Sequence, residues 1–373
     1  MFVKKINLKN YYMFKENRIE FRYPENTQNI VNVLIGENGT GKTKILELIF
    51  CYASRGAHSN NYSGKVLFEG KDSTVELLDS NNHVMLNNNI MWSETLNERI
   101  YFVKSELLHS LHRGGTGLDA MVDNRVIEIN EQFTANSLQL ISKAVLEKER
   151  ALNESNPDVR KAKAIEWFND YFTETQLKSK LVEIEKLTGN PIFSGVDGQQ
   201  KFQFNELSSG EKQLYIKVAS LFLLEPSNSL ILIDEPELSL HPEWQASFIG
   251  LLKKIGANNQ FILATHSPYM ISNLDPKDHL IRLQFDVQKN IQVDYDPEFD
   301  ERDINTTLGS IMGYSHQIPP RVLKLRKEYR EYFDRHQENN DKAIKVKKHL
   351  LEYETLKSSF FQELEFLKAL RHD

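Results

Sequence analysis

The chain has 373 residues, of which 40% are hydrophobic and 26% charged, so it can bury a substantial core in one large domain or in several smaller ones. Its net charge of −6 argues against a uniformly basic coat for nucleic acid, although local basic patches stay open. The single cysteine, Cys51, excludes a disulfide framework and fits a reducing compartment. The N-terminus lacks the apolar core of a signal peptide, and no run of about 18 apolar residues occurs, so we expect a cytoplasmic protein without a membrane partner.

Residues 1–103 alternate strand-like and turn-like sequence and are predicted to form the N-terminal lobe of an α/β domain. The run Ile30–Ile35 is nearly all apolar, and it passes through Gly36 into a helical pattern that ends near Phe50. We therefore expect a buried strand that leads directly into a helix. The strand-like runs are Phe2–Leu8, Arg18–Tyr23, Ile30–Ile35, Lys65–Glu69, Thr74–Leu78 and Arg99–Val103.

Residues 104–200 are mostly helix-forming and are predicted to be a helical insertion. Two charged stretches, Lys143–Glu154 and Val159–Leu187, flank a Ser-Asn-Pro break at 155–157, which predicts two helical arms joined by a turn. Strand-like sequence resumes at Lys201–Phe204.

Residues 201–290 are predicted to complete the α/β domain, and residues 291–373 to form a helical C-terminal extension. The first segment holds a helical pattern at Gln213–Leu224 and buried strands at Leu230–Ile233 and Phe261–Ala264. The extension is predicted to begin with an acidic loop that contains Asp294, Asp296, Glu298, Asp300, Glu301 and Asp303.

A glycine-rich loop stands between the Ile30–Ile35 strand and the following helix, which is the setting that phosphate binding needs. Glycines permit a tight turn, so backbone N–H groups and the helix N-terminus can point at phosphates. Lys42 would reach the β- and γ-phosphates of ATP, and Thr43 would hold Mg²⁺. The alternative is a glycine-rich turn that fits the pattern by chance. The predicted nucleotide contacts come from Gly36, Asn38, Gly39, Gly41, Lys42 and Thr43.

Two acids, Asp234 and Glu235, follow the apolar strand Leu230–Ile233 at its carboxyl end, where ligands bind in α/β sheets. Asp234 would anchor the metal through its water shell, and Glu235 would polarise the water that attacks the γ-phosphate. The alternative is a core strand that ends in a solvated acidic turn.

Three further segments indicate a function only through their positions relative to the first two motifs. Leu207–Glu211 would alone be only a helix start, but it precedes Asp234 by one predicted helix. Ser239–Pro242 follows the acidic pair, and Ala264–Pro268, which contains His266, closes the next buried strand. A histidine after an apolar strand more often has a structural role, so a functional role for His266 depends on the other motifs.

In this order, the five motifs resemble those of the ABC ATPase superfamily. The resemblance implies an α/β fold, namely an ABC-ATPase head with a P-loop, a mixed sheet and an N-terminal antiparallel β lobe, which binds Mg·ATP between two protomers. It implies that Ser208 and Gly210 of the LSGGQ-like signature touch the γ-phosphate held by the opposite protomer, and that His266 contacts the same phosphate. Ser209 and Glu211 depart from the usual glycine and glutamine of that signature.

Ile6–Phe14 followed by GENGTGKT, with the later phrases DEPELSLHP and THSP, resembles the RecF, SMC and OLD-like branch. The likeness is greatest to PtuA-like ATPases of bacterial antiphage systems, over residues 1–50 and 200–275. It implies a homodimer or higher even oligomer that regulates a partner effector such as an HNH-type nuclease. Tyr12 stands where the branch usually has a basic residue, and no glutamine for metal sensing follows Arg99–Val103.

OLD-type nucleases carry a Toprim domain after the ATPase, and Asp294 and Asp296 form an Asp-x-Asp pair of the kind found there. No Glu-Gly strand precedes this pair, so an acidic loop is favoured. The nuclease is then expected on a separate chain.

Basic residues outnumber acidic ones between Arg321 and Lys348. This stripe could contact the phosphates of nucleic acid, or it could be the solvated face of a helix. Beyond it, apolar residues at helical spacing predict an amphipathic terminal helix that packs on its own domain or binds a partner. These apolar residues are Leu350, Tyr353, Leu356, Phe360, Leu364 and Leu367.

Three functions are compatible with these patterns. The leading one is an ATP-gated dimeric regulator of a nuclease or toxin in antiphage defence. A RecF-like DNA-repair ATPase that acts as an ATP-gated clamp on DNA is the alternative. A transporter subunit is disfavoured by the long insertion, and the neighbouring gene would separate the three.

Overall fold

The computed structural model describes residues 1–25, 27–53, 72–78, 84–85, 100–103, 126–129, 137–175, 177–195, 198, 200–224, 226–295, 320–356 and 358–370. The chain divides into two compact units, Met1–Met312 and Gly313–Asp373. None of the helices in the described ranges is both long and apolar enough to cross a membrane. The predicted strand Lys65–Glu69 and the acidic residues beyond Tyr295 lie outside the described residues.

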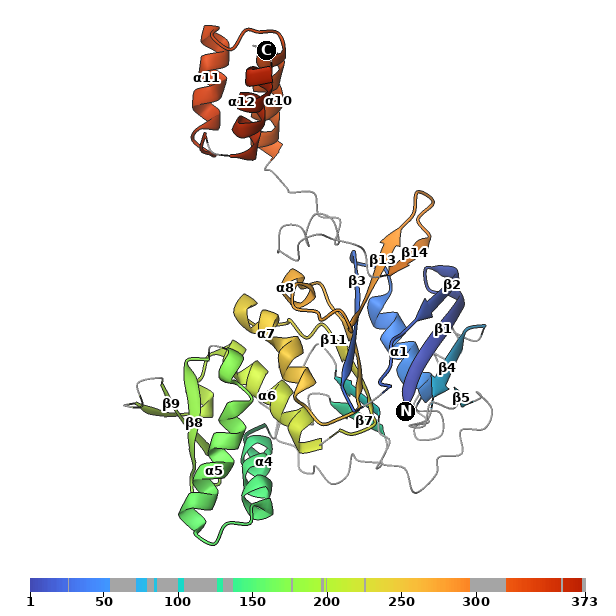
Figure 1. Ribbon diagram of the computed structural model, residues 1–373, viewed down its shortest axis with the longest axis vertical. Coiled ribbons are helices and arrows are strands. Elements are labelled where there is room, and N and C mark those ends of the chain that lie inside the picture. The colour runs from blue at the N-terminus through green and yellow to red at the C-terminus, as the bar shows by residue number, and fades with distance from the viewer. Residues whose placement is uncertain are drawn as a thin grey trace. The chain divides into compact units, whose positions relative to one another are not determined.

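A seven-stranded sheet forms the centre of the first unit, with the order β14-β13-β3-β12-β11-β6-β7 (Figure 1). Neighbouring strands run parallel, except for the antiparallel pair β13 and β14. Asp234 lies opposite Ala264, which lies opposite Leu34, so β11 and β12 end at the same level and β3 continues for two more residues to Gly36. The strands are β3 (Ile30–Gly36), β6 (Ile100–Val103), β7 (Val126–Ile129), β11 (Leu230–Asp234), β12 (Gln260–Ala264), β13 (His279–Phe285) and β14 (Ile291–Tyr295).

The predicted N-terminal antiparallel lobe is confirmed as a second sheet with the order β2-β1-β4-β5. Helix α1 (Lys42–Ala53) lies with this sheet on one face of the central sheet (Figure 1). Ile45 and Ile49 of α1 share a buried core there with Leu232 and Ile262 of the central strands. The strands of the lobe are β1 (Phe2–Tyr11), β2 (Phe14–Glu20), β4 (Thr74–Leu78) and β5 (Val84–Met85).

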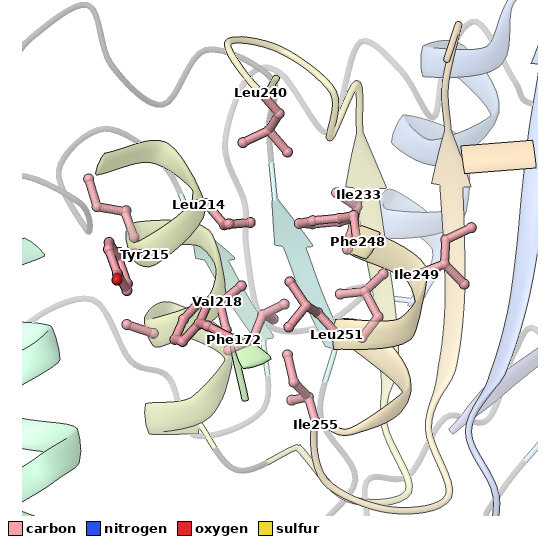
Figure 2. Close-up of a cluster of buried hydrophobic side chains, with 14 of the residues drawn as sticks. Phe172, Leu214, Tyr215, Val218, Ile233, Leu240, Phe248, Ile249, Leu251 and Ile255 are labelled. Carbon is pink, nitrogen blue, oxygen red and sulfur yellow. The ribbon is translucent and has the colours of Figure 1, made fainter. Parts of the chain in front are cut away.

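The opposite face of the central sheet is covered by α6 (Ser209–Leu224), α7 (Pro242–Lys253) and the short α8 (Pro268–Ile271) (Figure 1). Side chains of α6 and α7 converge there on Ile233, as Figure 2 shows. Successive strand residues point to opposite faces, so Ile233 faces these helices while Leu232 faces α1. The sheet therefore separates α1 from α6.

The predicted helical arms of the insertion are confirmed as α4 (Ser137–Ala151) and α5 (Pro157–Asp170). Asn156 caps α5, because its side chain accepts hydrogen bonds from the backbone N–H groups of Asp158 and Val159. A proline at the first helical position reinforces this start.

The predicted helix over Val159–Leu187 is wrong in its second half. After α5, a 3-10 turn (Thr173–Thr175) leads into a three-stranded antiparallel sheet with the order β10-β9-β8. Buried Ser179 and Leu181 alternate with exposed Lys180, which is the period-two pattern of a strand within a charged sequence. The strands are β8 (Ser179–Ile184), β9 (Pro191–Gly195) and β10 (Lys201–Gln203), followed by a 3-10 turn at Phe204–Glu206.

The acidic loop predicted after residue 290 is also wrong at its start, because Ile291–Tyr295 forms β14. Asp294 of this strand pairs with Arg282 of β13, so its carboxylate serves the sheet. Asp296, the other member of the Asp-x-Asp pair, lies outside the described residues.

The second unit contains the helices α10 (Pro320–Asp334), α11 (Asp341–Leu350) and α12 (Ser359–Leu370). The predicted single amphipathic helix from Leu350 to Leu367 is wrong, because a turn separates α11 from α12. Leu350 and Leu364 contribute to the core that these helices share, whereas Tyr353 in the turn is exposed.

Part of the basic stripe is used inside this second unit. Arg326 pairs with Glu354 at 2.6 Å, and Arg330 pairs with Glu363 at 2.9 Å. These arginines join α10 to the segment around α12, so they contribute to packing within the unit. Contact of the remaining lysines with nucleic acid stays a prediction.

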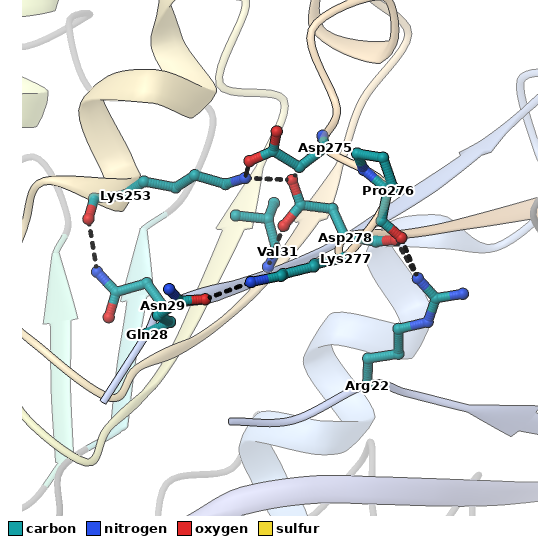
Figure 3. Close-up of polar contacts among 9 residues, drawn as sticks. All are labelled: Arg22, Gln28, Asn29, Val31, Lys253, Asp275, Pro276, Lys277 and Asp278. Atoms are coloured by element: carbon teal, nitrogen blue, oxygen red, sulfur yellow. Dashed lines mark hydrogen bonds and ion pairs between the residues drawn. The ribbon is translucent and has the colours of Figure 1, made fainter. Parts of the chain in front are cut away.

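A polar network at the amino ends of β3 and β13 holds the end of α7 against the central sheet (Figure 3). The Lys253 ammonium lies 2.6 Å from one carboxylate oxygen of Asp278, and it also pairs with Asp275. The other oxygen of Asp278 accepts from the Val31 N–H at 3.1 Å. The Asp278 side chain is 1% exposed and that of Asp275 is 62% exposed, so Asp278 is the structurally important partner.

We expect Asp278→Ala to lower the free energy of unfolding of the first unit by about 2–3 kcal/mol, because Lys253 and the Val31 N–H lose a buried acceptor. Asp275→Ala removes an exposed partner of the same lysine and should cost less than about 1 kcal/mol. Urea denaturation followed by circular dichroism measures both variants. Equal losses would contradict the structural role given to Asp278.

Candidate functional site

The loops that follow β3, β11 and β12 lie at the aligned carboxyl edge of the central sheet. They carry the predicted phosphate loop, the acidic pair and the histidine segment, respectively. Parallel register therefore assembles at one edge three motifs that are far apart in sequence.

Close packing explains two glycines of the phosphate loop. A side chain at Gly36 would lie 2.2 Å from the Leu283 carbonyl oxygen, and one at Gly41 would lie 2.7 Å from the Phe14 ring. Gly41 also has a φ of +88°, in the left-handed region that glycine adopts readily. The exposed tip of the loop consists of Glu37, Asn38 and Gly39.

Lys42 reaches back across this loop. Its ammonium donates to the carbonyl oxygens of Gly36 at 2.9 Å and Glu37 at 3.2 Å, and the residue is only 6% exposed. Burial lowers the pKa of Lys42 to about 8, although the acidic residues after β11 attract its charge and oppose this shift. A phosphate would be a stronger partner than neutral carbonyl groups for this ammonium.

Thr43 and Asp234 join the first predicted motif to the second. The Thr43 hydroxyl lies 3.0 Å and 3.2 Å from the two carboxylate oxygens of Asp234, to which it donates. Burial raises the pKa of Asp234 to about 6, against the opposing effect of this hydrogen bond. A hydroxyl beside a carboxylate offers the oxygen ligands that Mg²⁺ prefers, so the pair fits the predicted metal.

The turn after β11 holds the histidine segment through an acid that was not among the predicted site residues. Glu237 accepts from the His266 backbone N–H at 2.5 Å and from the Thr265 hydroxyl at 2.7 Å, and burial raises its pKa. Glu235 begins the turn with a φ of +45°, and its N–H donates to Ala264 at 2.8 Å. The third acid of the DEPEL phrase was the available signal for Glu237.

Lys217 of α6 holds the same turn through hydrogen bonds to its backbone. Its buried ammonium donates to the carbonyl oxygens of Pro236 at 2.8 Å and Leu238 at 3.2 Å, and burial lowers its pKa to about 8. A lysine within a nearly apolar helix was the signal that could have identified this residue.

His266 lies at the same edge as Lys42. Burial lowers the pKa of His266, and the Lys42 charge lowers it further, which favours the neutral imidazole. Ser267 caps the following short helix and donates to Gln245 at 2.6 Å, which fixes the backbone on the other side of the histidine. The structure therefore brings the predicted His266 to the loop of Lys42.

The predicted signature residues Ser208 and Gly210 lie at the start of α6, away from the phosphate loop. Ser208 is exposed at the start of α6, on the face of the sheet opposite α1 and Lys42. A side chain at Gly210 would lie 2.6 Å from the Trp244 ring and 2.9 Å from the Ser239 carbonyl oxygen. Packing within the chain is thus sufficient to require a glycine at position 210.

The chain is similar in sequence to known proteins. Residues 122–272 match the family described as "AAA domain, putative AbiEii toxin, Type IV TA system". The chain is 24% identical to the Septu protein PtuA of Bacillus thuringiensis over 356 residues, which cover 85% of this chain and 86% of that protein. The predicted resemblance to PtuA-like ATPases is confirmed.

A second relative is the Retron Vc95 probable ATPase of Vibrio cholerae serotype O1 biovar El Tor. It is 32% identical over 168 residues, which cover 41% of this chain and 32% of that protein. Among solved structures, the SMC head domain from Thermotoga maritima is 17% identical, with a TM-score of 0.42, and the match covers 80% of this chain and 100% of that one. Relatives named as ATPases support nucleotide binding by this chain.

Tyr12 marks a difference from the basic residue that is usual at this position. It lies in the turn between β1 and β2 with a φ of +55°, and it is 59% exposed. Its ring carbon Cδ1 would be 3.3 Å from a side chain at Gly41, so an aromatic surface borders the phosphate loop.

The lowered pKa of Lys42 predicts that ATP affinity depends on pH. The ammonium is charged below about pH 8 and loses its proton above it. The dissociation constant for ATP should therefore rise above pH 8 by up to about tenfold per pH unit, until the higher pKa of the phosphate-bound lysine is reached.

Titration with a fluorescent ATP analogue, in the presence of a metal chelator and over about pH 6.5 to 9.5, measures this dependence. Lys42→Arg keeps its charge throughout and should show a flat profile, although its geometry weakens binding. A flat profile for the wild-type chain would contradict the assignment of Lys42 to the phosphates.

Proposed function

We propose that this chain is a dimeric ATPase that binds and hydrolyses Mg·ATP and thereby regulates a partner effector. One observation carries the proposal. Lys42, Thr43 and Asp234 meet at the edge where three parallel strands end, while the exposed signature residue Ser208 lies on the opposite face of the sheet.

The phosphate loop is the proposed nucleotide site. The backbone N–H groups of the loop would bind the phosphates, and they belong to Gly36, Asn38, Gly39 and Gly41. The Lys42 ammonium would leave the carbonyl oxygens of the loop and bind phosphate oxygens instead. Thr43 and Asp234 would hold Mg²⁺, which supplies neutralisation of phosphate charge when bound. The exposed Tyr12 ring beside Gly41 offers a surface on which a nucleobase would stack.

Glu235 is the proposed residue that orients and polarises the attacking water. It follows Asp234 directly, so the strand that positions the metal ligand also positions this carboxylate. His266, held by its backbone N–H on Glu237, would donate a hydrogen bond to the γ-phosphate from its neutral ring. Glu237 acts through His266, and it is a positioning residue.

Dimerisation is proposed because the signature and the phosphate loop belong to different faces of one chain. Ser208 and Gly210 lie at the start of α6, where Ser208 is exposed and Gly210 is buried, and the N–H groups of a helix start favour an anion. Two chains in opposed orientation would place the signature of each against the phosphate loop of the other. ATP would then be the shared ligand that closes the dimer.

We further propose that this ATPase serves antiphage defence and that its effector is a separate protein, such as an HNH-type nuclease. The support is the likeness to the Septu protein PtuA over most of both chains and to a retron ATPase. The Arg282 ion pair of Asp294 also removes one carboxylate of the Asp-x-Asp pair from metal chemistry.

Glu235→Gln tests the proposed hydrolysis and dimer closure together. The variant loses the carboxylate that polarises water but keeps the contacts of Lys42, Thr43 and Asp234, so ATP should bind while turnover falls at least about a hundredfold. Size-exclusion chromatography with light scattering should show an ATP-dependent dimer that is longer-lived than that of the wild-type chain.

Lys42→Ala is the matched control for this experiment, since it should bind no ATP and stay in the ATP-free oligomeric state. Hydrolysis at the wild-type rate by Glu235→Gln would assign the general base to another residue. An oligomeric state that never responds to ATP would overturn the dimeric switch.

A further inference from the structure

The first turn of α6 is attached to strand β8 of the insertion through one residue, Ser179. The Ser179 hydroxyl donates to the Glu211 carboxylate at 2.7 Å. Tyr215, one helical turn further along α6, donates its hydroxyl to the Ser179 carbonyl oxygen at 2.8 Å. One face of α6 therefore fixes both the side chain and the backbone of this strand residue.

This attachment is buried. Ser179 is 3% exposed, and the Tyr215 ring packs 4.8 Å from the Phe172 ring and 5.0 Å from the Phe193 ring, measured between centroids. Figure 2 shows Phe172 and Tyr215 in the same apolar cluster. Water cannot readily replace a hydrogen bond lost in such a place, so α6 and β8 are expected to move as one piece.

The carboxylate that binds Ser179 also holds the signature serine. The other oxygen of Glu211 accepts from the Ser208 hydroxyl at 2.8 Å and from the Ser208 N–H at 3.1 Å. In return, the Ser208 hydroxyl accepts from the Glu211 N–H at 3.3 Å. This reciprocal capping fixes the start of α6 and the place of the Ser208 side chain.

A charged carboxylate suits this position better than the glutamine that is usual in the signature. A carboxylate only accepts hydrogen bonds, and the Ser179 hydroxyl, the Ser208 hydroxyl and the Ser208 N–H all donate to Glu211. A glutamine has one acceptor oxygen instead of two, so its N–H₂ group would need one of the two serine hydroxyls to turn and accept. Glu211 and Ser179 therefore form a matched pair.

We infer that Ser179 is a positioning residue for the ATPase reaction, since it holds Glu211 and thereby sets where Ser208 is presented to the nucleotide of a partner protomer. When Ser208 turns its hydroxyl to a phosphate, Ser179 remains as a donor that keeps the Glu211 carboxylate satisfied. Strand β8 is then the physical link from the insertion to the ATP site. The inference rests on the proposed function, in which Ser208 meets that nucleotide.

Ser179→Ala in the full chain tests this link. The expected result is a fall in kcat of about five- to tenfold, from loss of one buried hydrogen bond to a charged group, with less than about a twofold change in the dissociation constant for ATP. The dissociation constant should hold because the phosphate loop lies on the other face of the sheet. Ser179→Thr keeps the hydroxyl and should retain most of kcat.

Ser194→Ala is the matched control. Ser194 is a buried serine of β9 that lies opposite Lys180 of β8, in the same small sheet. Its loss should leave kcat at the wild-type value. If Ser194→Ala lowers kcat as much as Ser179→Ala does, general loosening of the insertion explains both, and the inference fails.

A Ser208→Ala background separates this inference from the proposed function. If Ser179 acts through Ser208, adding Ser179→Ala to Ser208→Ala should cause no further loss of kcat, whereas losses that multiply would overturn the inference. Wild-type activity of Ser208→Ala would refute the proposed function itself. A damaged Ser208→Ala beside an unaffected Ser179→Ala would refute only the inference.

Tyr215→Phe provides a second variant in case Ser179→Ala does not fold. It removes the hydrogen bond to the Ser179 carbonyl and the 3.3 Å contact between the Tyr215 and Ser179 hydroxyls, and it keeps the aromatic packing. It should lower kcat in the same direction, by about two- to fivefold, with the dissociation constant for ATP unchanged. An unchanged kcat in this variant would count against the link.

Discussion

The hydrogen bond from Thr43 to Asp234 ties the first turn of α1, which follows β3, to the end of β11, although β12 lies between β3 and β11. It can form only because Leu34, Ala264 and Asp234 share one level in adjacent parallel strands. If β12 shifted by a residue against β3, β11 would shift with it, and Asp234 would lie farther from Thr43. His266, which follows β12, would be displaced from the phosphate loop as well. The register of these three buried strands is thus the constraint on which the candidate site depends.

The charged groups of the candidate site are buried without full compensation by one another. Burial lowers the pKa of Lys42 and raises those of Asp234 and Glu237, so charges of both signs are held at a cost that their mutual attraction does not remove. A polyphosphate with a divalent cation would satisfy the ammonium and the carboxylate together. Perturbed groups of this kind gather at functional sites, which agrees with nucleotide binding at this edge of the sheet.

The ATPase head was largely predictable because its motifs are local. Each motif can be recognised within about ten residues. Glycines mark the phosphate loop, and apolar runs mark the strands before Asp234 and His266. The strand β8 was missed because its alternation, with Lys180 between Ser179 and Leu181, is hidden in a charged stretch that resembles a helix. Helix propensity is a weak prior, and the tertiary contacts of Ser179 override it here.

The roles of residues that act through long-range contacts could not be predicted from the spacing of motifs in the sequence. Glu237 gains its role only from the approach of Thr265 and His266, and Lys217 only from the turn that it supports. The acidic segment after residue 290 was misjudged for the same reason, because Arg282 on the neighbouring strand turns Asp294 into a structural group. Local patterns indicate which residues carry the chemistry, and strand pairing decides which of them meet.

The proposed dimer requires that Ser208 of one chain contacts the nucleotide in the phosphate loop of another. Mixing Lys42→Ala with Ser208→Arg, each inactive alone, tests it most directly by ATPase assay. In a mixed dimer one site carries both lesions and the other carries neither, so the account predicts that mixing restores part of the wild-type activity. Robust hydrolysis by Ser208→Arg alone, or no recovery in mixed dimers shown to form, would contradict it.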